Sequence, residues 1–204
     1  MKKMVIFFVL FLLFSADSVF AQKEDPASDL YFKEAKKEAG FIFSMAEYGS
    51  GFGAFMVWPF GSKFHAGLTF DAYFLRDPKQ IEIADPYYGG YYSYNKVNNV
   101  YLFNLFITVK RRFFAEDVDD SVRPFLSAGF GPIAGYNFPE IEELPDQSSW
   151  TLGGYAGAGV DITFDVKYFI SARAQYRIAS FPERLGVTSN HSMFELRFEL
   201  GRRF

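Results

Sequence analysis

Strict alternation of apolar and polar residues recurs along this chain, and it constrains the fold more than any other feature. The last segment shows it best, with Phe194, Leu196, Phe198 and Leu200 alternating with Glu195, Arg197 and Glu199. Because successive side chains of a β-strand point to opposite faces, this pattern predicts strands that each have one apolar and one polar face. The same period appears in residues 63–76, 97–113, 149–164 and 167–179, and no long segment after residue 38 has a helical period.

Eight segments are expected to form an all-β fold, an antiparallel up-and-down transmembrane β-barrel with a polar filled lumen. They are Glu38–Ala46, Gly51–Pro59, Lys63–Arg76, Val97–Phe113, Arg123–Tyr136, Ser149–Phe164, Lys167–Ala179 and His191–Phe204. Most are near the roughly ten residues that a tilted strand needs to cross a bilayer, and bacterial outer-membrane barrels have an even number of strands. The first, second and fifth segments are weaker, because both of their faces carry aromatic residues or glycine.

Two kinds of β-protein have alternating strands, and they differ in which face meets water. A soluble sandwich or lipocalin-like barrel buries the apolar face, whereas a membrane barrel turns that face to lipid and keeps a polar lumen. Gly67, Gly153, Gly157 and Gly159 share the polar face of their strands, where small residues make room for charged neighbours in a narrow interior. Together with an aromatic content of 21%, these glycines favour the membrane barrel.

The first 21 residues have the features of a cleavable signal peptide. Lys2 and Lys3 precede an apolar run, Met4–Phe14, and Ala21 provides a small residue before a cut ahead of Gln22. The run is too short to span a bilayer, and the alternative is an uncleaved anchor. The expected organisation is a signal peptide at 1–21, a periplasmic leader at 22–37 and an outer-membrane barrel domain at 38–204.

The connections between the strands predict an orientation. If the exported chain begins in the periplasm, eight strands leave both termini periplasmic and place segments 77–96, 137–148 and 180–190 outside the cell. Most of the connections at the periplasmic end are shorter, and this asymmetry is usual for outer-membrane barrels. The sequence therefore predicts an integral protein of the bacterial outer membrane, with outer-membrane lipid around it.

The composition excludes several kinds of site. The chain has no cysteine, which excludes a thiolate metal site and a cysteine nucleophile, and it has only two histidines, His65 and His191. Its formal net charge of −3 argues against a nucleic-acid partner. We expect no cofactor and no metal site.

The polar faces of the strands predict a network of charged side chains in the lumen. The interior of an eight-stranded barrel is just wide enough for side chains to fill, and buried charges need partners. A filled interior also predicts poor conduction. The expected network consists of His65, Asp71, Lys110, Asp161, Arg173, Arg177, Glu195, Arg197 and Glu199.

Short patterns in Arg123–Gly129, Gly157–Asp161 and Ala172–Arg177, and the terminal Phe204, give the chain a family resemblance. From Glu38 to Phe204 it resembles the small eight-stranded outer-membrane barrels, such as the membrane domain of outer membrane protein A. The resemblance implies that Phe204 is part of an assembly signal read by the barrel-assembly machinery, and a monomer is expected. Arg202 departs from the usual pattern, which has an aromatic residue at that position.

Two of the outer loops have compositions that could serve binding. One contains Tyr87, Tyr88, Tyr91, Tyr92 and Tyr94, and tyrosine offers flat contact area and a hydroxyl group at a low entropic cost. This loop could bind an extracellular ligand of unknown identity, or simply rest on lipid headgroups. The acidic segment 139–146 could hold a divalent cation, or be a solvated loop.

Three functions remain after these exclusions. The first is a non-enzymatic barrel with a structural or surface-interaction role through its extracellular loops. The second is a porin-like conduit for small apolar molecules. The third, a lipid-modifying barrel enzyme, is disfavoured because His191 and Ser192 are adjacent and therefore point to opposite faces of a strand, so that they cannot converge with Glu195. No catalytic residue is assigned.

Overall fold

The computed structural model describes residues 36–60, 64–76, 81–84, 87, 89, 91–94, 98–113, 122–140, 144–164 and 167–204. The expected signal peptide, and all of the expected leader except Lys36 and Lys37, lie outside the described residues. Among the described residues, no helix has both the length and the apolar composition required to cross a membrane.

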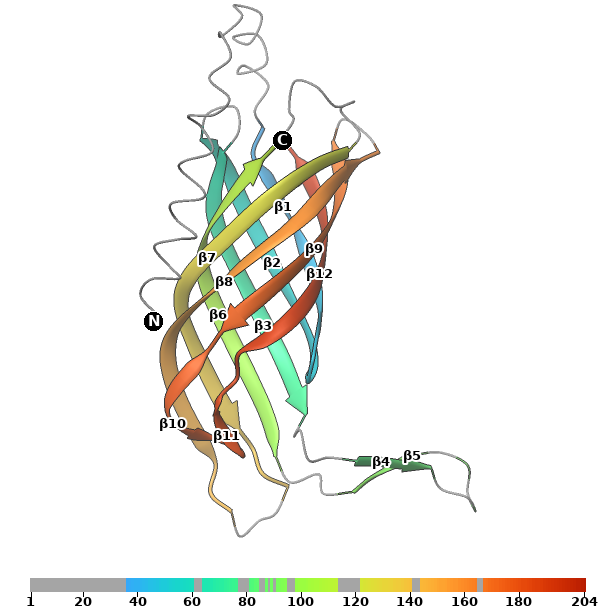
Figure 1. Ribbon diagram of the computed structural model, residues 1–204, viewed down its shortest axis with the longest axis vertical. Helices are drawn as coiled ribbons and strands as arrows, with labels where there is room; N and C mark the ends of the chain where they lie inside the picture. The colour runs from blue at the N-terminus through green and yellow to red at the C-terminus, as the bar shows by residue number, and fades with distance from the viewer. Residues whose placement is uncertain are drawn as a thin grey trace, which may run out of the picture. The chain divides into compact units, whose positions relative to one another are not determined.

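Eight antiparallel strands close into one barrel (Figure 1). They are β1 (Glu38–Ala46), β2 (Gly49–Phe60), β3 (Phe64–Arg76), β6 (Asn99–Arg112), β7 (Val122–Asn137), β8 (Gln147–Thr163), β9 (Tyr168–Ile178) and β12 (Met193–Arg203). Each strand pairs with its sequence neighbours around the barrel, and β1 pairs with β12 from Glu38↔Arg203 to Ala46↔Glu195. Lys37 and Phe204 exchange two backbone hydrogen bonds beyond that register. The predicted eight-stranded barrel is confirmed.

Two further hairpins lie in the connections at the end of the barrel away from β1's first residue. β4 (Ile81–Ala84) pairs with β5 (Tyr91–Tyr94) between β3 and β6, and β10 (Ser180–Leu185) pairs with β11 (Thr188–Asn190) between β9 and β12. No strand was expected in either connection. A positive φ of 67° at Gly186 lets β10 turn into β11, because a residue without Cβ adopts that conformation without strain.

The exterior of the barrel is apolar and the interior carries the charges, which is the reverse of a soluble β-protein. On β12, Phe198 is 43% exposed on the outer surface, whereas its neighbour Arg197 is 1% exposed and lies inside. Phe194, Leu196 and Leu200 also face outwards, and Glu195 and Glu199 are buried. Closure pairs the backbone groups of every strand, which hydrocarbon requires because it cannot hydrogen-bond them.

Exposed aromatic residues lie near both ends of the strands. Trp58 and Phe60 lie near the end that holds the termini, and Phe74, Tyr101, Tyr136 and Trp150 lie near the other end, as the sequence predicts for a membrane protein. The same expectation is wrong for Tyr73 and Phe181. Both are buried inside the barrel, because they fall on the lumen-facing positions of their strands.

Candidate functional site

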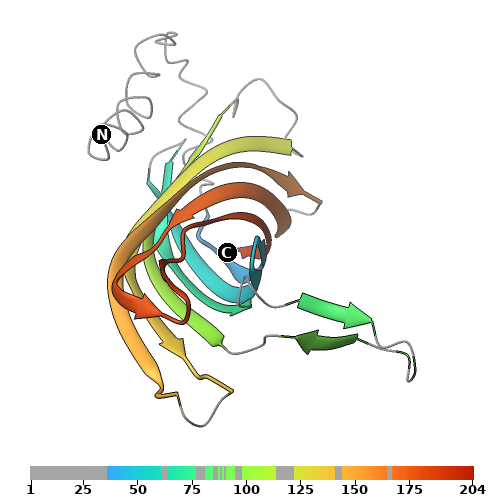
Figure 2. The same cartoon turned by 60° about the horizontal axis from the view of Figure 1, so that its bottom comes forward.

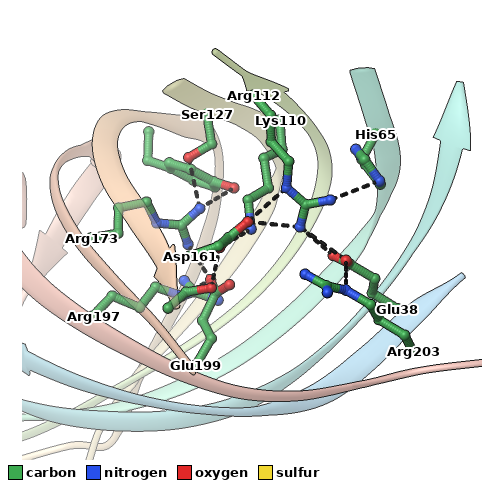
Figure 3. A network of polar contacts seen from close by, with 12 residues as sticks. Glu38, His65, Lys110, Arg112, Ser127, Asp161, Arg173, Arg197, Glu199 and Arg203 are labelled. Carbon is green, nitrogen blue, oxygen red and sulfur yellow. Dashed lines mark hydrogen bonds and ion pairs between the residues drawn. The ribbon is translucent and has the colours of Figure 1, made fainter. Parts of the chain in front are cut away.

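The half of the lumen nearer the termini is crossed by a network of ion pairs (Figure 3). Asp161 on β8 accepts hydrogen bonds from Lys110 Nζ and Arg112 Nε, each at 2.7 Å, and from the hydroxyl of Ser171. Arg112 also donates to both carboxylate oxygens of Glu38 at 2.9 Å, and Arg203 Nε donates to Glu38 at 3.0 Å. Strands β1, β6, β8, β9 and β12 are thus joined through the interior rather than only along their edges.

A second group of contacts lies beside the first, centred on two arginines. Arg197 donates through both terminal nitrogens to Asp71 at 2.8 and 3.0 Å, and this pair connects β12 with β3. Arg173 Nη2 lies 2.9 Å from Glu199 Oε1, and Arg173 Nη1 donates to Ser127 Oγ at 2.7 Å. The bidentate Arg197–Asp71 pair fixes the relative position of strands that are not neighbours in the barrel.

A third group occupies the middle of the lumen. The guanidinium of Arg177 lies 3.7 Å above the centre of the Tyr73 ring, and its Nη2 atom is 2.5 Å from Glu195 Oε1. That contact is an ion pair by distance but does not have the angles of a hydrogen bond. The other carboxylate oxygen of Glu195 accepts from the Tyr73 hydroxyl at 2.8 Å and from Gln175 at 2.7 Å.

All nine residues that the sequence assigns to the lumen are buried there. Besides the eight charged residues of the three groups, His65 Nε2 lies 3.0 Å from Arg112 Nη1. Sequence reasoning missed Glu38, Arg112 and Arg203. Parity would have identified the two arginines, since Arg112 lies two residues after Lys110 and Arg203 lies four residues after Glu199.

The network leaves no carboxylate of the three groups without a cation. Glu38, Asp71, Asp161, Glu195 and Glu199 each lie within 2.9 Å of an arginine or lysine nitrogen. Side chains of opposite charge therefore fill the section instead of an aqueous path, and the arginines at its centre are about as inaccessible to water as core residues. This arrangement can hold the barrel rigid, and among the described residues it leaves no charged channel wall facing open water.

The half of the lumen away from the termini is apolar. Its core includes Leu75, Val100, Leu102, Ile133 and Met193, all buried on lumen-facing positions of five different strands. The polar interior that the sequence predicts therefore covers only the half nearer the termini. The switch occurs at one level of the barrel, where Arg177 and Glu195 give way to Ala179 and Met193 on the same strands.

The β10–β11 hairpin covers this apolar half, as seen with that end turned forward (Figure 2). Phe181 and Leu185 of β10 are 4% and 0% exposed and pack on Gly135 of β7, where a Cβ would collide with Leu185. The Gly186 N–H donates to Gln147 Oε1 at 2.7 Å. His191 Nε2 lies 3.1 Å from the carbonyl oxygens of both Leu185 and Thr188, which holds the turn of the hairpin.

A pocket with a volume of about 230 Å³ remains between this hairpin and the opposite wall of the barrel mouth. Leu75, Val100 and Met193 form part of its lining from the barrel, and Leu185 and Val187 contribute from the hairpin. Burial lowers the pKa of His191, which also lines the pocket, below its usual value; the two carbonyl contacts act in the opposite direction, and the positive charge of Arg177 lowers it slightly further.

The residues weighed for catalysis do not come together. Ser192 Oγ donates to Asn190 Oδ1 at 2.7 Å and accepts the Ala179 N–H, His191 Nε2 contacts two carbonyls, and Glu195 contacts Arg177. Within the part of the chain that the structure describes, no group of three or more His, Asp or Glu side chains could hold a metal ion. Residues 141–143 of the acidic segment lie outside the described residues.

The tyrosine-rich connection is described only in part. Tyr87 is 90% exposed, and Tyr91, Tyr92 and Tyr94 belong to β5, where Tyr92 pairs with Ile83 and Tyr94 pairs with Ile81. Tyr88 lies outside the described residues. The tyrosines are therefore presented on a β-hairpin, not on an irregular loop.

No family model matches the sequence, and no curated protein sequence is similar to it. The fold is similar to three solved outer-membrane barrels. Neisserial surface protein A has a TM-score of 0.56 and 14% identity over 82% of this chain and 96% of that one. The N-terminal β-barrel domain of Pseudomonas aeruginosa OprF has a TM-score of 0.54 and 12% identity over 84% and 98%. Pseudomonas aeruginosa OprG has a TM-score of 0.50 and 12% identity over 84% and 97%. At these identities the likeness shows the fold.

Proposed function

We propose that this chain, which has the fold of the small eight-stranded outer-membrane β-barrels, is a non-enzymatic protein of the bacterial outer membrane with a structural or surface-interaction role. Both termini lie in the periplasm, and the end that carries the β4–β5 and β10–β11 hairpins lies outside the cell. The outer-membrane lipid surrounds the barrel, which is a monomer. The observation that carries this proposal is the filled lumen.

The contents of the lumen argue against transport through the barrel. Asp161, Glu195 and Arg197 are each 0–1% exposed although they lie in the interior, so water-sized probes do not reach them. An ion that passed through would have to displace several salt bridges, and breaking a buried pair is strongly unfavourable. Above this network, Phe181 and Leu185 close the apolar half. The role is therefore assigned to the exterior and to the connections.

The β4–β5 hairpin is the best candidate for a contact surface. Its connection holds five tyrosines, and Tyr87 extends to water with 90% exposure. Tyrosine rings bind flat surfaces such as sugars, and the hydroxyl adds a hydrogen bond. A headgroup-resting loop remains the competing interpretation, and the binding experiment below separates the two.

Location and conduction are tested first. In a membrane fractionation, the mature protein is expected in the outer membrane, with a gel mobility that changes on boiling. In planar bilayers it is expected to give no reproducible conductance step. A stable pore would overturn the closed-barrel proposal and favour the conduit.

Surface binding is tested with a variant in which Tyr87, Tyr88, Tyr91 and Tyr92 are replaced by serine. Binding to immobilised glycans and to purified lipopolysaccharide should fall, and heat-modifiability should be unchanged. Tyr48→Ser, at the β1–β2 turn of the same end, is the matched control. If the multiple variant binds as the parent does, the tyrosine surface has no such role.

A lipid-modifying activity has no support from the geometry, because Ser192, His191 and Glu195 are engaged with different partners. Mass spectrometry of lipid A from cells with and without the protein tests this directly. Identical spectra are expected.

Phe204 is proposed as part of the assembly signal. It is 56% exposed and closes the barrel seam through its backbone bonds with Lys37. Arg202, which stands where an aromatic residue is more usual, lies outside with its guanidinium 6.0 Å from the Tyr168 ring. Removing Phe204 should reduce the assembled, heat-modifiable fraction in cells by interfering with the barrel-assembly machinery.

A further inference from the structure

The pocket at the barrel mouth has an apolar floor. Leu75 of β3, Val100 of β6 and Met193 of β12 are between 1% and 6% exposed, and they belong to the apolar half of the lumen. Leu185 and Val187, at the turn of the β10–β11 hairpin, form an adjoining wall. A ligand that entered would therefore meet hydrocarbon below and beside it, which favours an apolar body.

The remaining lining residues are polar, and none of them is acidic. Tyr48, Asn98, Thr188, Asn190 and Ser192 are uncharged hydrogen-bonding residues, while Arg76 brings a positive charge from the end of β3 and His191 a titratable ring. Arg76 is held at the pocket through its backbone, because its N–H donates to the carbonyl of Tyr48 at 2.7 Å. The electrostatic character of the lining is positive, so a polar head bound there is favoured when it carries negative charge.

The size of the pocket limits the ligand. A volume of about 230 Å³ is below the range of about 300–1,000 Å³ that drug-sized ligands occupy. It suits a single short chain or one ring, not a phospholipid. We propose that this pocket binds a small anionic amphiphile, a medium-chain carboxylate, with its chain on Leu75, Val100 and Met193 and its carboxylate beside Arg76. This site goes beyond the proposed surface role of the tyrosine hairpin and does not depend on it.

The experiment must separate pocket binding from partition into the bilayer, because octanoate does both. The protein is labelled with ¹³C at its Leu, Val and Met methyl groups, placed in lipid nanodiscs and titrated with sodium octanoate. The methyl signals of Leu75, Val100 and Met193 should shift along a saturating curve. Those of Leu68 and Leu196, which face lipid on the exterior, should shift in proportion to the added octanoate.

Octanol and octylamine test the charge, since both carry the same chain. Octylamine is expected to give no saturable shift, and octanol a weaker one than octanoate. Arg76→Gln should weaken octanoate binding by about threefold to fivefold, the usual strength of a partly exposed ion pair, without changing octanol binding. Arg184→Gln, on the exposed part of β10, is the matched control and should change neither.

Thr188→Trp should fill the mouth of the pocket and abolish saturation for every probe. Glu183→Trp places the same side chain on an exposed position of the same hairpin and should leave binding unchanged. Heat-modifiability confirms that each variant has folded. Proportional shifts at all methyl groups of the parent protein would show partition only and overturn the proposal. Equal binding of octylamine would overturn the anionic head.

Discussion

Replacing Asp161 by asparagine should be among the most damaging single changes in this barrel. The carboxylate is 0% exposed, and it accepts hydrogen bonds from Lys110 and Arg112 at 2.7 Å and from Ser171. Asparagine keeps the shape but removes the negative charge, so two buried cations lose their shared partner. Arg112 retains Glu38, whereas no other anion contacts Lys110 among the described ion pairs, and its ammonium is left over the Phe125 ring at 4.0 Å.

The expected cost follows from that unpaired ammonium. Removing one partner of a buried ion pair typically destabilises a protein by about 3–5 kcal/mol, because the remaining charge stays desolvated. Adding Lys110→Met to Asp161→Asn removes the unpaired charge as well, and the double variant should regain about 2–3 kcal/mol of that loss. Asp146→Asn, at an exposed position, should change the free energy of unfolding by less than about 0.5 kcal/mol.

Denaturant unfolding from lipid vesicles measures these differences. Trp58 and Trp150 lie on the exterior of the barrel, so their fluorescence reports the transfer from hydrocarbon to water. The free energy is obtained by linear extrapolation to zero denaturant. A loss below about 1 kcal/mol for Asp161→Asn, or a double variant less stable than the single one, would show that the network is hydrated and does not hold the strands together.

Three other outcomes are expected. Phe198→Arg, on the lipid-facing side of β12, should cost about 2–4 kcal/mol in the same unfolding assay, and no effect would mean that this face does not meet hydrocarbon. The burial of His191, with Arg177 nearby, lowers the pKa of that imidazole, so the folded hairpin binds fewer protons than the open one. Its stability should be complete above the ordinary imidazole pKa of about 6.5 and should fall as the pH drops below it, until the lowered pKa is passed. Amide exchange of Gly186, compared with that in His191→Gln, measures this, and identical pH profiles would contradict it. Replacing residues 180–190 by a short glycine linker should still give no steady conductance in planar bilayers, because the ion-paired section remains; a regular pore would show that the hairpin alone closes the barrel.

Much of the barrel could be predicted from alternation because lipid enforces it. On β3, β6, β8, β9 and β12, every second residue turns out as the sequence indicates, with residues such as Ile107 and Leu196 outside and Lys110 and Arg197 inside. Parity alone also places buried charges in the lumen. It does not tell which charges meet, since Arg197 reaches Asp71 across the interior from a position 126 residues away, and that depends on the tilt and stagger of the closed barrel.

The β10–β11 hairpin could not be recognised in the same way. Its segment contains Pro182 and several exposed polar residues, including Glu183 and Arg184, so its local composition is that of a loop. Only Phe181 and Leu185 are apolar on the lumen-facing parity, and two residues do not establish a period. Their role becomes visible once the barrel shows an apolar half that needs a cover.

That cover follows from the distribution of residues along four strands. At one level of the barrel, the lumen-facing positions change from charged or amide residues to apolar ones: Asp71 is followed by Tyr73 and Leu75, Asn104 is preceded by Leu102 and Val100, Arg177 is followed by Ala179, and Glu195 is preceded by Met193. An open barrel would expose all of this apolar surface to water at its mouth, at a cost of about 25 cal/mol per Å². Folding Phe181 and Leu185 inward removes that cost and leaves the lumen closed twice, by apolar packing at one level and by ion pairs at the next. Because the two closures use different forces, high salt or a charge substitution should loosen only the ionic one, whereas a cavity cut at Leu185 should loosen only the apolar one. A protein closed in this redundant way has little to transport through its centre, which places its function at the mouth and on the hairpins around it.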